Sequence, residues 1–170
     1  MSGQAYFADG DPGPIVAALA QVPELLGPTA AFLSAALGPG AASTRHKEIA
    51  ILRTSWLQGC RYCTEAHSVV ALDSGLTAEE VRALRADEPL AAGFTDPAER
   101  SLIEWIDTMA RSGPVPSQLW ASTRAFWPEH LLVELSVTIG ATIFLNRFAT
   151  CFELPSAPAV VERLAAEGWS

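Results

Sequence analysis

Apolar residues recur three and four positions apart along almost the whole chain, and this spacing constrains the fold most strongly. Residues at those spacings share one face of an α-helix, whereas a half-buried strand needs alternating polar and apolar residues. No clear alternating run is found, and no low-complexity segment or change of composition marks a linker. We therefore predict one all-α domain over residues 1–170, built as a helical bundle of six to eight helices.

Proline, glycine and helix-capping residues divide the sequence into those helices. The 14–37 region is predicted to be helical but broken near Pro23 and Pro28, because proline interrupts helix hydrogen bonding. Start signals follow at Ser43 or Thr44, at the capping box Thr77–Glu80, and at Asp96–Pro97. The further helices are expected at about 44–58, from Cys60 to before Gly75, from about 77, and at 97–110, 117–126, 128–152 and 159–167.

Composition and charge exclude several classes of protein. Hydrophobic residues make up 49% of the 170 residues and charged residues 18%, which leaves apolar surface for subunit interfaces beyond one core. The formal net charge is −8, so binding to nucleic acid or to an anionic membrane is disfavoured.

Targeting and membrane signals are weak. The first twelve residues carry Asp9 and Asp11 but no basic residue, which is not typical of a signal peptide. The apolar run 131–152 is interrupted by Glu134, Asn146 and Arg147, which favours a buried helix over a membrane span. We expect a soluble, cytoplasmic protein.

The stretch GCRYCTEAH, residues 59–67, contains Cys60, Cys63 and His67. On a helix these three residues share one face. A thiolate near a helix N-terminus is stabilised by the free amides there, and a histidine one turn later can take or give a proton. The spacing therefore combines a thiol pair and a base in one element.

Three interpretations of this stretch compete. The cysteines can be structural thiols beside a hydrogen-bonded histidine. They can belong to a zinc site, but only three ligands are present locally, and His46, His130 or Cys151 would complete it only by chance of folding. The third interpretation, dithiol redox chemistry, is favoured because the histidine lies in register with both thiols.

Glu48 borders the apolar stripe of the preceding helix and is expected to be partly desolvated. In one interpretation Arg45 or another basic residue neutralises it. In the other, the short connection packs the two helices together, and Glu48 orients His67 as the third member of a thiol–base–carboxylate relay. Periodicity does not choose between them.

The combined pattern E-x11-C-x2-C-x3-H, from Glu48 to His67, resembles the core of the AhpD-like alkylhydroperoxidases, within the carboxymuconolactone-decarboxylase-like superfamily. The motif core covers about residues 44–75, and a looser resemblance includes LNRF (145–148) and LP (154–155). The resemblance implies an all-helical fold in obligate oligomers, commonly trimers or hexamers, with no metal or organic cofactor.

The resemblance also assigns roles to the motif residues. Cys63 is implied to attack the peroxide and Cys60 to resolve the sulfenic acid as a disulfide, while Glu48 and His67 form the proton relay. A lipoyl- or thioredoxin-like dithiol protein is implied as the reductant. One departure is Tyr62, because some members carry a histidine just before the second cysteine, and a neutral phenol is no base near neutral pH.

The predicted function is therefore a cysteine-based peroxidase or thiol–disulfide oxidoreductase that acts on organic hydroperoxides. The alternatives are a non-enzymatic redox sensor or oligomeric dithiol protein, and a zinc-binding protein.

Other residues carry weaker expectations. Cys151 is expected to be a packed free cysteine. Asn146 and Arg147 are candidates for the pocket, for a pair with Glu48, or for a subunit interface. Trp56 is a candidate pocket wall, and His46 and His130 are expected to be exposed.

Overall fold

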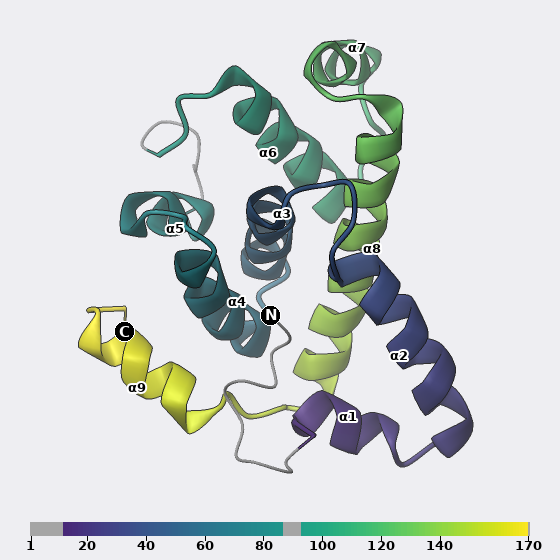
Figure 1. The fold of residues 1–170 in the computed structure, drawn as a ribbon, viewed down its shortest axis with the longest axis vertical. Helices are drawn as coiled ribbons and strands as arrows, with labels where there is room; N and C mark the ends of the chain where they lie inside the picture. The colour runs from purple at the N-terminus through teal and green to yellow at the C-terminus, as the bar shows by residue number, and fades with distance from the viewer. Residues whose placement is uncertain (1–11, 87–92, 170) are drawn as a thin grey trace.

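The computed structural model describes residues 12–86 and 93–169, so Asp9 and Asp11 lie outside the described residues. These ranges contain nine helices and no strand, which confirms the all-α prediction (Figure 1). The helices are α1 Pro14–Leu19, α2 Pro23–Leu37, α3 Thr44–Leu57, α4 Arg61–Asp73, α5 Ala78–Leu84, α6 Pro97–Ala110, α7 Ser117–Phe126, α8 Glu129–Cys151 and α9 Pro158–Ala166.

The described helix count exceeds the predicted upper limit of eight by one, because the 14–37 region forms two helices. The predicted break at Pro23 is confirmed, since this proline occupies the first position of α2. The predicted break at Pro28 is wrong, and α2 continues through it. Pro28 and Glu24 are both exposed, so water can bind the Glu24 carbonyl that lacks its helical partner.

The predicted start signals of three helices are confirmed. The Ser43 hydroxyl accepts a hydrogen bond from the His46 amide at the start of α3. Thr77 and Glu80 form a complete capping box on α5. Asp96 caps α6 with Pro97 at its first position, so side-chain acceptors satisfy amides that the helices leave free.

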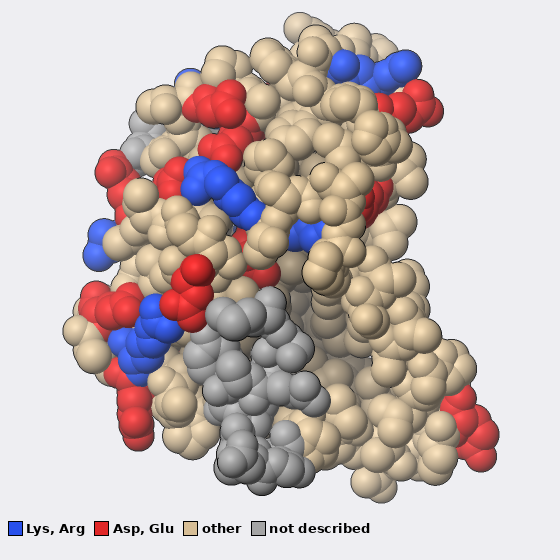
Figure 2. All heavy atoms as spheres, in the orientation of Figure 1, with Lys and Arg blue, Asp and Glu red and all other residues tan. Residues whose placement is uncertain are grey.

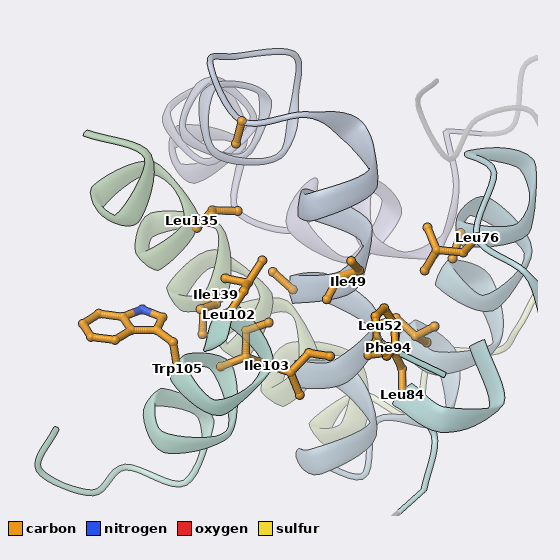
Figure 3. Packing of buried hydrophobic residues seen from close by; sticks show 14 of the residues in the cluster. Ile49, Leu52, Leu76, Leu84, Phe94, Leu102, Ile103, Trp105, Leu135 and Ile139 are labelled. Atoms are coloured by element: carbon orange, nitrogen blue, oxygen red, sulfur yellow. The ribbon is translucent and has the colours of Figure 1, made fainter. Parts of the chain in front are cut away.

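Helix α3 lies near the middle of the bundle, with α4 and α5 on one side and α8 on the other (Figure 1). Its Ile49 and Leu52 are fully buried and belong to the main hydrophobic core. Leu102 of α6 and Ile139 of α8 enter the same core (Figure 3). A helix packed on several sides in this way is held rigidly, which suits it to position a site.

The buried lysine of α3, Lys47, is fully paired. The Lys47 ammonium donates to the Gly38 carbonyl at 2.6 Å and contacts Glu134 at 2.8 Å. These contacts join α3 to the end of α2 and to α8. Burying an ammonium without such partners would be costly.

Helix α8 is long and apolar enough, by length and composition, to cross a membrane, although core helices of soluble proteins pass the same test. It packs against α2, α3, α4 and α6, and 39% of its most apolar 18-residue window is buried in the chain. Much of an apolar helix therefore faces outward.

Candidate active site at the thiol pair

A tight turn between α3 and α4 brings the sequence motif together. Gly59 adopts a φ of +64°, a region that suits glycine, and the Cys60 amide donates to the Ser55 carbonyl at 3.1 Å. The chain therefore reverses direction within a few residues. His67 Nδ1 lies 2.9 Å from Glu48 Oε2 as a result.

This contact shows which basic residue pairs with Glu48. The carboxylate is buried and pairs with His67 across the two helices. Arg45, which was the alternative partner, instead binds Glu80 and Glu99. The tertiary arrangement thus places an acid–base pair one helical turn from the thiols.

Cys60 is the N-cap residue of α4. Its Sγ accepts a hydrogen bond from the Cys63 amide at 3.3 Å, and only 1% of Cys60 is exposed. Cys63 lies in the first turn of α4, and both cysteines pack against Ala149 of α8. The thiol pair therefore lies at a helix N-terminus, where free amides favour negative charge on sulfur.

The two thiols differ in their affinity for a proton. A hydrogen bond from the Cys63 thiol lowers the pKa of Cys60 to about 6 against the effect of burial, helped by the Cys63 amide and the Thr150 hydroxyl. The pKa of Cys63 is raised, because its thiol is hydrogen-bonded to Cys60, is buried, and lies beside the Cys60 charge. Because the two thiols share a hydrogen bond, they titrate together as a pair, and the first proton leaves more readily than it would from a free thiol.

Cys63, rather than Cys60, carries the sulfur with access to the cavity. Cys63 lines the main cavity, whereas Cys60 is not among the residues of its wall. Transfer of the shared proton along the Cys63–Cys60 hydrogen bond moves the negative charge to the sulfur that faces the cavity. The geometry thus supplies both a reservoir for the charge and a path for it to reach the cavity.

His67 is the titratable base of the site. Burial alone would lower its pKa, but the Glu48 carboxylate and the negative charge on Cys60 outweigh burial and raise it. The side chain is 27% exposed and lines the cavity. His67 therefore retains a proton to higher pH than a free histidine and can deliver it into the cavity.

The cavity measures about 540 Å³ and is mostly apolar. Its polar side includes Glu48, Cys63, His67 and Tyr62. Its apolar walls come from six helices, and the residues include Ile15, Leu33, Ile51, Val70, Leu145 and Val160. A volume of this size accommodates an organic molecule well beyond a peroxide group.

Tyr62 replaces the histidine that the resemblance would place before the second cysteine. Burial raises the pKa of its phenol to about 12, with the charges of the two cysteines adding to the effect. The phenol is therefore neutral at physiological pH and offers the cavity a hydrogen-bond donor and an aromatic face rather than a base.

Asn146 and Arg147 take no direct part in the cavity wall. Asn146 is buried and accepts a hydrogen bond from the Ser55 hydroxyl at 3.2 Å. Arg147 is exposed and donates to Gln58 at 2.7 Å. Neither residue lines the cavity, and neither pairs with Glu48 in the described contacts. Of the three roles considered for them, only the subunit interface remains.

Several weaker expectations are corrected. Cys151 is exposed rather than packed, because it ends α8 on the outward face. Trp56 is half-buried but does not line the cavity. His46 is half-buried, with its ring 4.7 Å from that of Trp127, whereas His130 is exposed as expected.

Sequence reasoning missed part of the site. Thr150, whose hydroxyl supports the Cys60 charge, lies 90 residues from Cys60 in a helix that carried only a loose resemblance. Lys47 and the cavity walls from α1, α2 and α9 were also missed. Their apolar residues have no chemical signature, so only packing reveals them.

Metal ligation was also considered. Among residues 12–86 and 93–169, no group of three or more His, Cys, Asp or Glu side chains is placed to hold a metal ion. The zinc interpretation therefore lacks a ligand set in the part of the chain that the structure describes.

The fold and the motif now agree with known proteins. The carboxymuconolactone decarboxylase family model matches residues 23–107, half of the chain, so the protein belongs to this family. A comparison with curated proteins finds no match.

Solved structures show the same fold at low sequence identity. A protein of unknown function from Agrobacterium tumefaciens, suggested to be the antioxidant defence protein AhpD, is 22% identical with a TM-score of 0.72, covering 82% of this chain and 94% of its own. A peroxidase-related protein from Ralstonia eutropha JMP134, with an alkylhydroperoxidase AhpD core, is 16% identical with a TM-score of 0.75, covering 84% and 76%.

The debrominase Bmp8 has the same fold, at 18% identity and a TM-score of 0.78, covering 90% of this chain and 82% of its own. A variant of that debrominase has been solved in complex with 2,3,4-tribromopyrrole. Proteins with this fold therefore act on more than one class of substrate.

Proposed function

We propose that the protein is a cysteine-based peroxidase that reduces organic hydroperoxides through the Cys60–Cys63 dithiol. The observation that supports this most strongly is the convergence of Cys63, His67 and Glu48 on one largely apolar cavity. A nucleophilic thiol, a proton donor and room for an organic group are what this reaction needs. Family membership and the fold are consistent with it.

The reaction begins when the Cys63 thiolate attacks the terminal oxygen of the hydroperoxide. The O–O bond breaks, Cys63 becomes a sulfenic acid, and the departing alkoxide takes a proton from His67 to leave as an alcohol. Glu48 stabilises the positive charge on His67 before this transfer. This step oxidises one sulfur by two electrons and reduces the peroxide by two.

Cys60 completes the turnover. Its sulfur attacks the Cys63 sulfenic acid, which forms the disulfide and releases water. The proton that Cys60 took from Cys63 leaves in this water, and the low pKa of Cys60, about 6, makes that proton easy to release. An external dithiol, of the lipoyl or thioredoxin-like kind, then reduces the disulfide by thiol exchange.

The proposal includes the setting of the enzyme. It operates in the cytoplasm, where reducing conditions keep the dithiol ready, and it works as a homo-oligomer without nucleic acid or membrane partners. The net charge of −8 supports the absence of both polyanionic partners.

The test is stopped-flow oxidation of the reduced full chain by an organic hydroperoxide, beside Cys63→Ser, Cys60→Ser and Cys151→Ser. We expect oxidation at least about 100-fold faster than that of a free thiol. Cys63→Ser should abolish it, and Cys60→Ser should stop at a sulfenic acid detectable by mass spectrometry. Cys151→Ser is the matched control, because this cysteine is exposed away from the cavity wall, and it should retain the rate.

Oxidation no faster than that of a free thiol would contradict the proposal. A single oxidation that external dithiols do not reverse would instead indicate a redox sensor. Repeated turnover with peroxide and dithiol distinguishes the enzyme from that alternative.

A second candidate function is reductive dehalogenation of an aromatic compound. The supporting observations are the large apolar cavity, the neutral phenol of Tyr62 and the fold shared with a debrominase. Cys63 would take the halogen from carbon, the carbon would gain a proton, and Cys60 would displace halide as the disulfide forms. Release of bromide from a bromopyrrole under the same assay conditions would distinguish this reaction from peroxide reduction.

A further inference from the structure

The charged side chains that line the main cavity already have partners. Among the described residues of its wall, those that carry a charge near neutral pH, besides the thiol of Cys63, are Lys47, Glu48 and His67. Glu48 and His67 form one pair, with 2.9 Å between Oε2 and Nδ1. Of the described wall residues, Lys47 is therefore the only cation outside that pair.

The ammonium of Lys47 has no donor left for a ligand. Its Nζ lies 2.6 Å from the Gly38 carbonyl oxygen, 3.5 Å from the Ala36 carbonyl oxygen and 2.8 Å from Oε1 of Glu134. An ammonium has three N–H donors, and three oxygens surround this one. The Lys47 side chain is only 4% exposed, so these oxygens take the place of water around it. Lys47 thus lines the cavity with its charge already neutralised.

Glu134 is held in place beside Lys47. Its other oxygen, Oε2, accepts hydrogen bonds from the Ala41 and Ala42 amides at 3.0 and 3.1 Å. Contact with Lys47, helped by these amides, lowers the pKa of Glu134 against the effect of burial, so the carboxylate stays ionised. A Cβ atom added at Gly40 would collide with Oε1 of Glu134. The glycine at this position therefore keeps the Lys47–Glu134 pair together.

The remaining charge in the cavity is negative. Glu48 and His67 balance each other, and the thiol pair carries negative charge once it loses its first proton. A carboxylate bound in the cavity would face that charge, and it would leave water without a cationic partner. Binding of a negatively charged ligand is therefore disfavoured.

The rest of the wall suits an apolar group. From Cys63 to Val70, the lining residues of α4 extend over about 10 Å of helix. Ser156 is a polar residue on the side of α9, but its hydroxyl donates to Glu65. Figure 2 shows a hollow beside α2 whose visible walls are mostly uncharged. A ligand can thus place an uncharged, apolar group in this space while its reactive end meets Cys63.

We propose that the cavity selects uncharged, apolar hydroperoxides and rejects hydroperoxides that carry a carboxylate, as those of fatty acids do, because Glu134 occupies the ammonium of Lys47. Lys47 and Glu134 are then specificity-determining residues that take no part in the reaction itself. The hydroperoxide group in this proposal rests on the proposed function. The choice between an uncharged and an anionic tail rests on the cavity.

The test compares two ligands of similar shape and different charge, para-isopropylcumyl alcohol and para-carboxycumyl alcohol. Both are alcohols, so they bind without oxidising a thiol. Isothermal titration calorimetry of the reduced full chain at neutral pH measures the two dissociation constants. We expect the uncharged alcohol to bind at least about 10-fold more tightly, because the anionic one finds no free cation.

Glu134→Gln removes the charge that neutralises Lys47 and keeps the shape of the side chain. The preference for the uncharged alcohol should then fall by about 10-fold or more, because the carboxylate of the ligand can pair with the ammonium. Adding Lys47→Met to Glu134→Gln should cancel this change. Glu129→Gln is the matched control, because it makes the same replacement on α8 at a side chain that is 64% exposed and away from the cavity wall.

A second variant tests the pair without removing either charge. Gly40→Ala should push the Glu134 carboxylate away from Lys47, and it should lower the preference in the same direction as Glu134→Gln. Circular dichroism of each variant checks that the helices are retained.

Several results would overturn the proposal. They are equal affinity of the wild type for the two alcohols, tighter binding of the anionic one, no measurable binding of either, or a preference that both Glu134→Gln and Gly40→Ala leave unchanged. Stopped-flow oxidation by the two corresponding hydroperoxides separates this proposal from the proposed function. Fast oxidation by both at equal rates would contradict the selectivity alone. Selective binding of the uncharged alcohol without fast oxidation would leave the selection by charge in place and contradict the proposed function.

Discussion

Helix α3 buries two acid–base pairs about one and a half turns apart, and they differ in how completely their partners satisfy them. Arg53 is fully buried and binds both carboxylate oxygens of Asp107, at 2.6 and 2.8 Å, and the carbonyls of Leu84 and Ala86. Glu48 contacts His67 through one hydrogen bond of 2.9 Å, and His67 is 27% exposed at the cavity.

The comparison shows why a buried charge alone does not mark a functional site. The guanidinium donors of Arg53 are occupied by acceptors on two segments, Asp107 of α6 and the carbonyls of Leu84 and Ala86 at the end of α5. Its pair can only hold the bundle together. The imidazole of His67 has a raised pKa because the Glu48 carboxylate lies beside it, and it opens onto a cavity, so this pair can move a proton.

The largest predicted effect is on the free energy of unfolding, and it distinguishes the Arg53–Asp107 pair from the Glu48–His67 pair. Asp107→Ala leaves the Arg53 guanidinium buried without its carboxylate, so the free energy of unfolding should fall by ~3–5 kcal/mol. Urea denaturation followed by circular dichroism measures it. Arg111→Ala is the control, because it removes only an exposed partner 3.6 Å from Asp107 and should change stability little. A loss below about 1 kcal/mol in Asp107→Ala would mean that this pair is not structural.

The next effect separates the pairs by activity. Glu48→Gln keeps the shape but removes the charge that holds a proton on His67, so the oxidation rate constant should fall about 100-fold. The free energy of unfolding should change by about 1 kcal/mol or less, since one hydrogen bond is altered. Glu65→Gln, a carboxylate of α4 that does not line the cavity, should retain the rate. Equal rates in Glu48→Gln and wild type would remove Glu48 from the relay.

The smallest effect concerns pH. The folded-state pKa of His67 is raised, so its stabilisation is complete below about pH 6.5 and is lost as pH rises through the folded pKa. The stability difference between wild type and Glu48→Gln should therefore be larger at pH 6 than at pH 9. NMR titration of the reduced protein, with His67→Gln to assign the signal, should show a lower His67 pKa in Glu48→Gln. A stability difference that is constant with pH would show that Glu48 does not act through the His67 proton.

Much of the fold could be predicted from local pattern. Start signals such as Ser43, the Thr77 capping box and Asp96–Pro97 are satisfied within a few residues, so the sequence carries their whole cause. Pro28 misled the prediction because the cost of a proline depends on whether water reaches the carbonyl it leaves free. That exposure belongs to the packed structure.

The site shows the same division. Cys60, Cys63 and His67 lie within eight residues on one helix, and their register follows from helix geometry alone. Whether His67 contacts Glu48 depends on how α3 and α4 pack against each other. Periodicity left that question open, and the 2.9 Å contact answers it.

The sequence by itself determined the all-helical class, most helix starts, the order of the thiol pair and its base, and the acidic charge that disfavours polyanionic partners. Those properties depend on residue type and on neighbours three or four positions away. The tertiary structure alone decided that Cys63 and not Cys60 faces the cavity, that Thr150 reaches Cys60 and that α8 leaves an apolar face outward. Those properties depend on which helices pack together, and packing joins residues whose separation in sequence carries no signal.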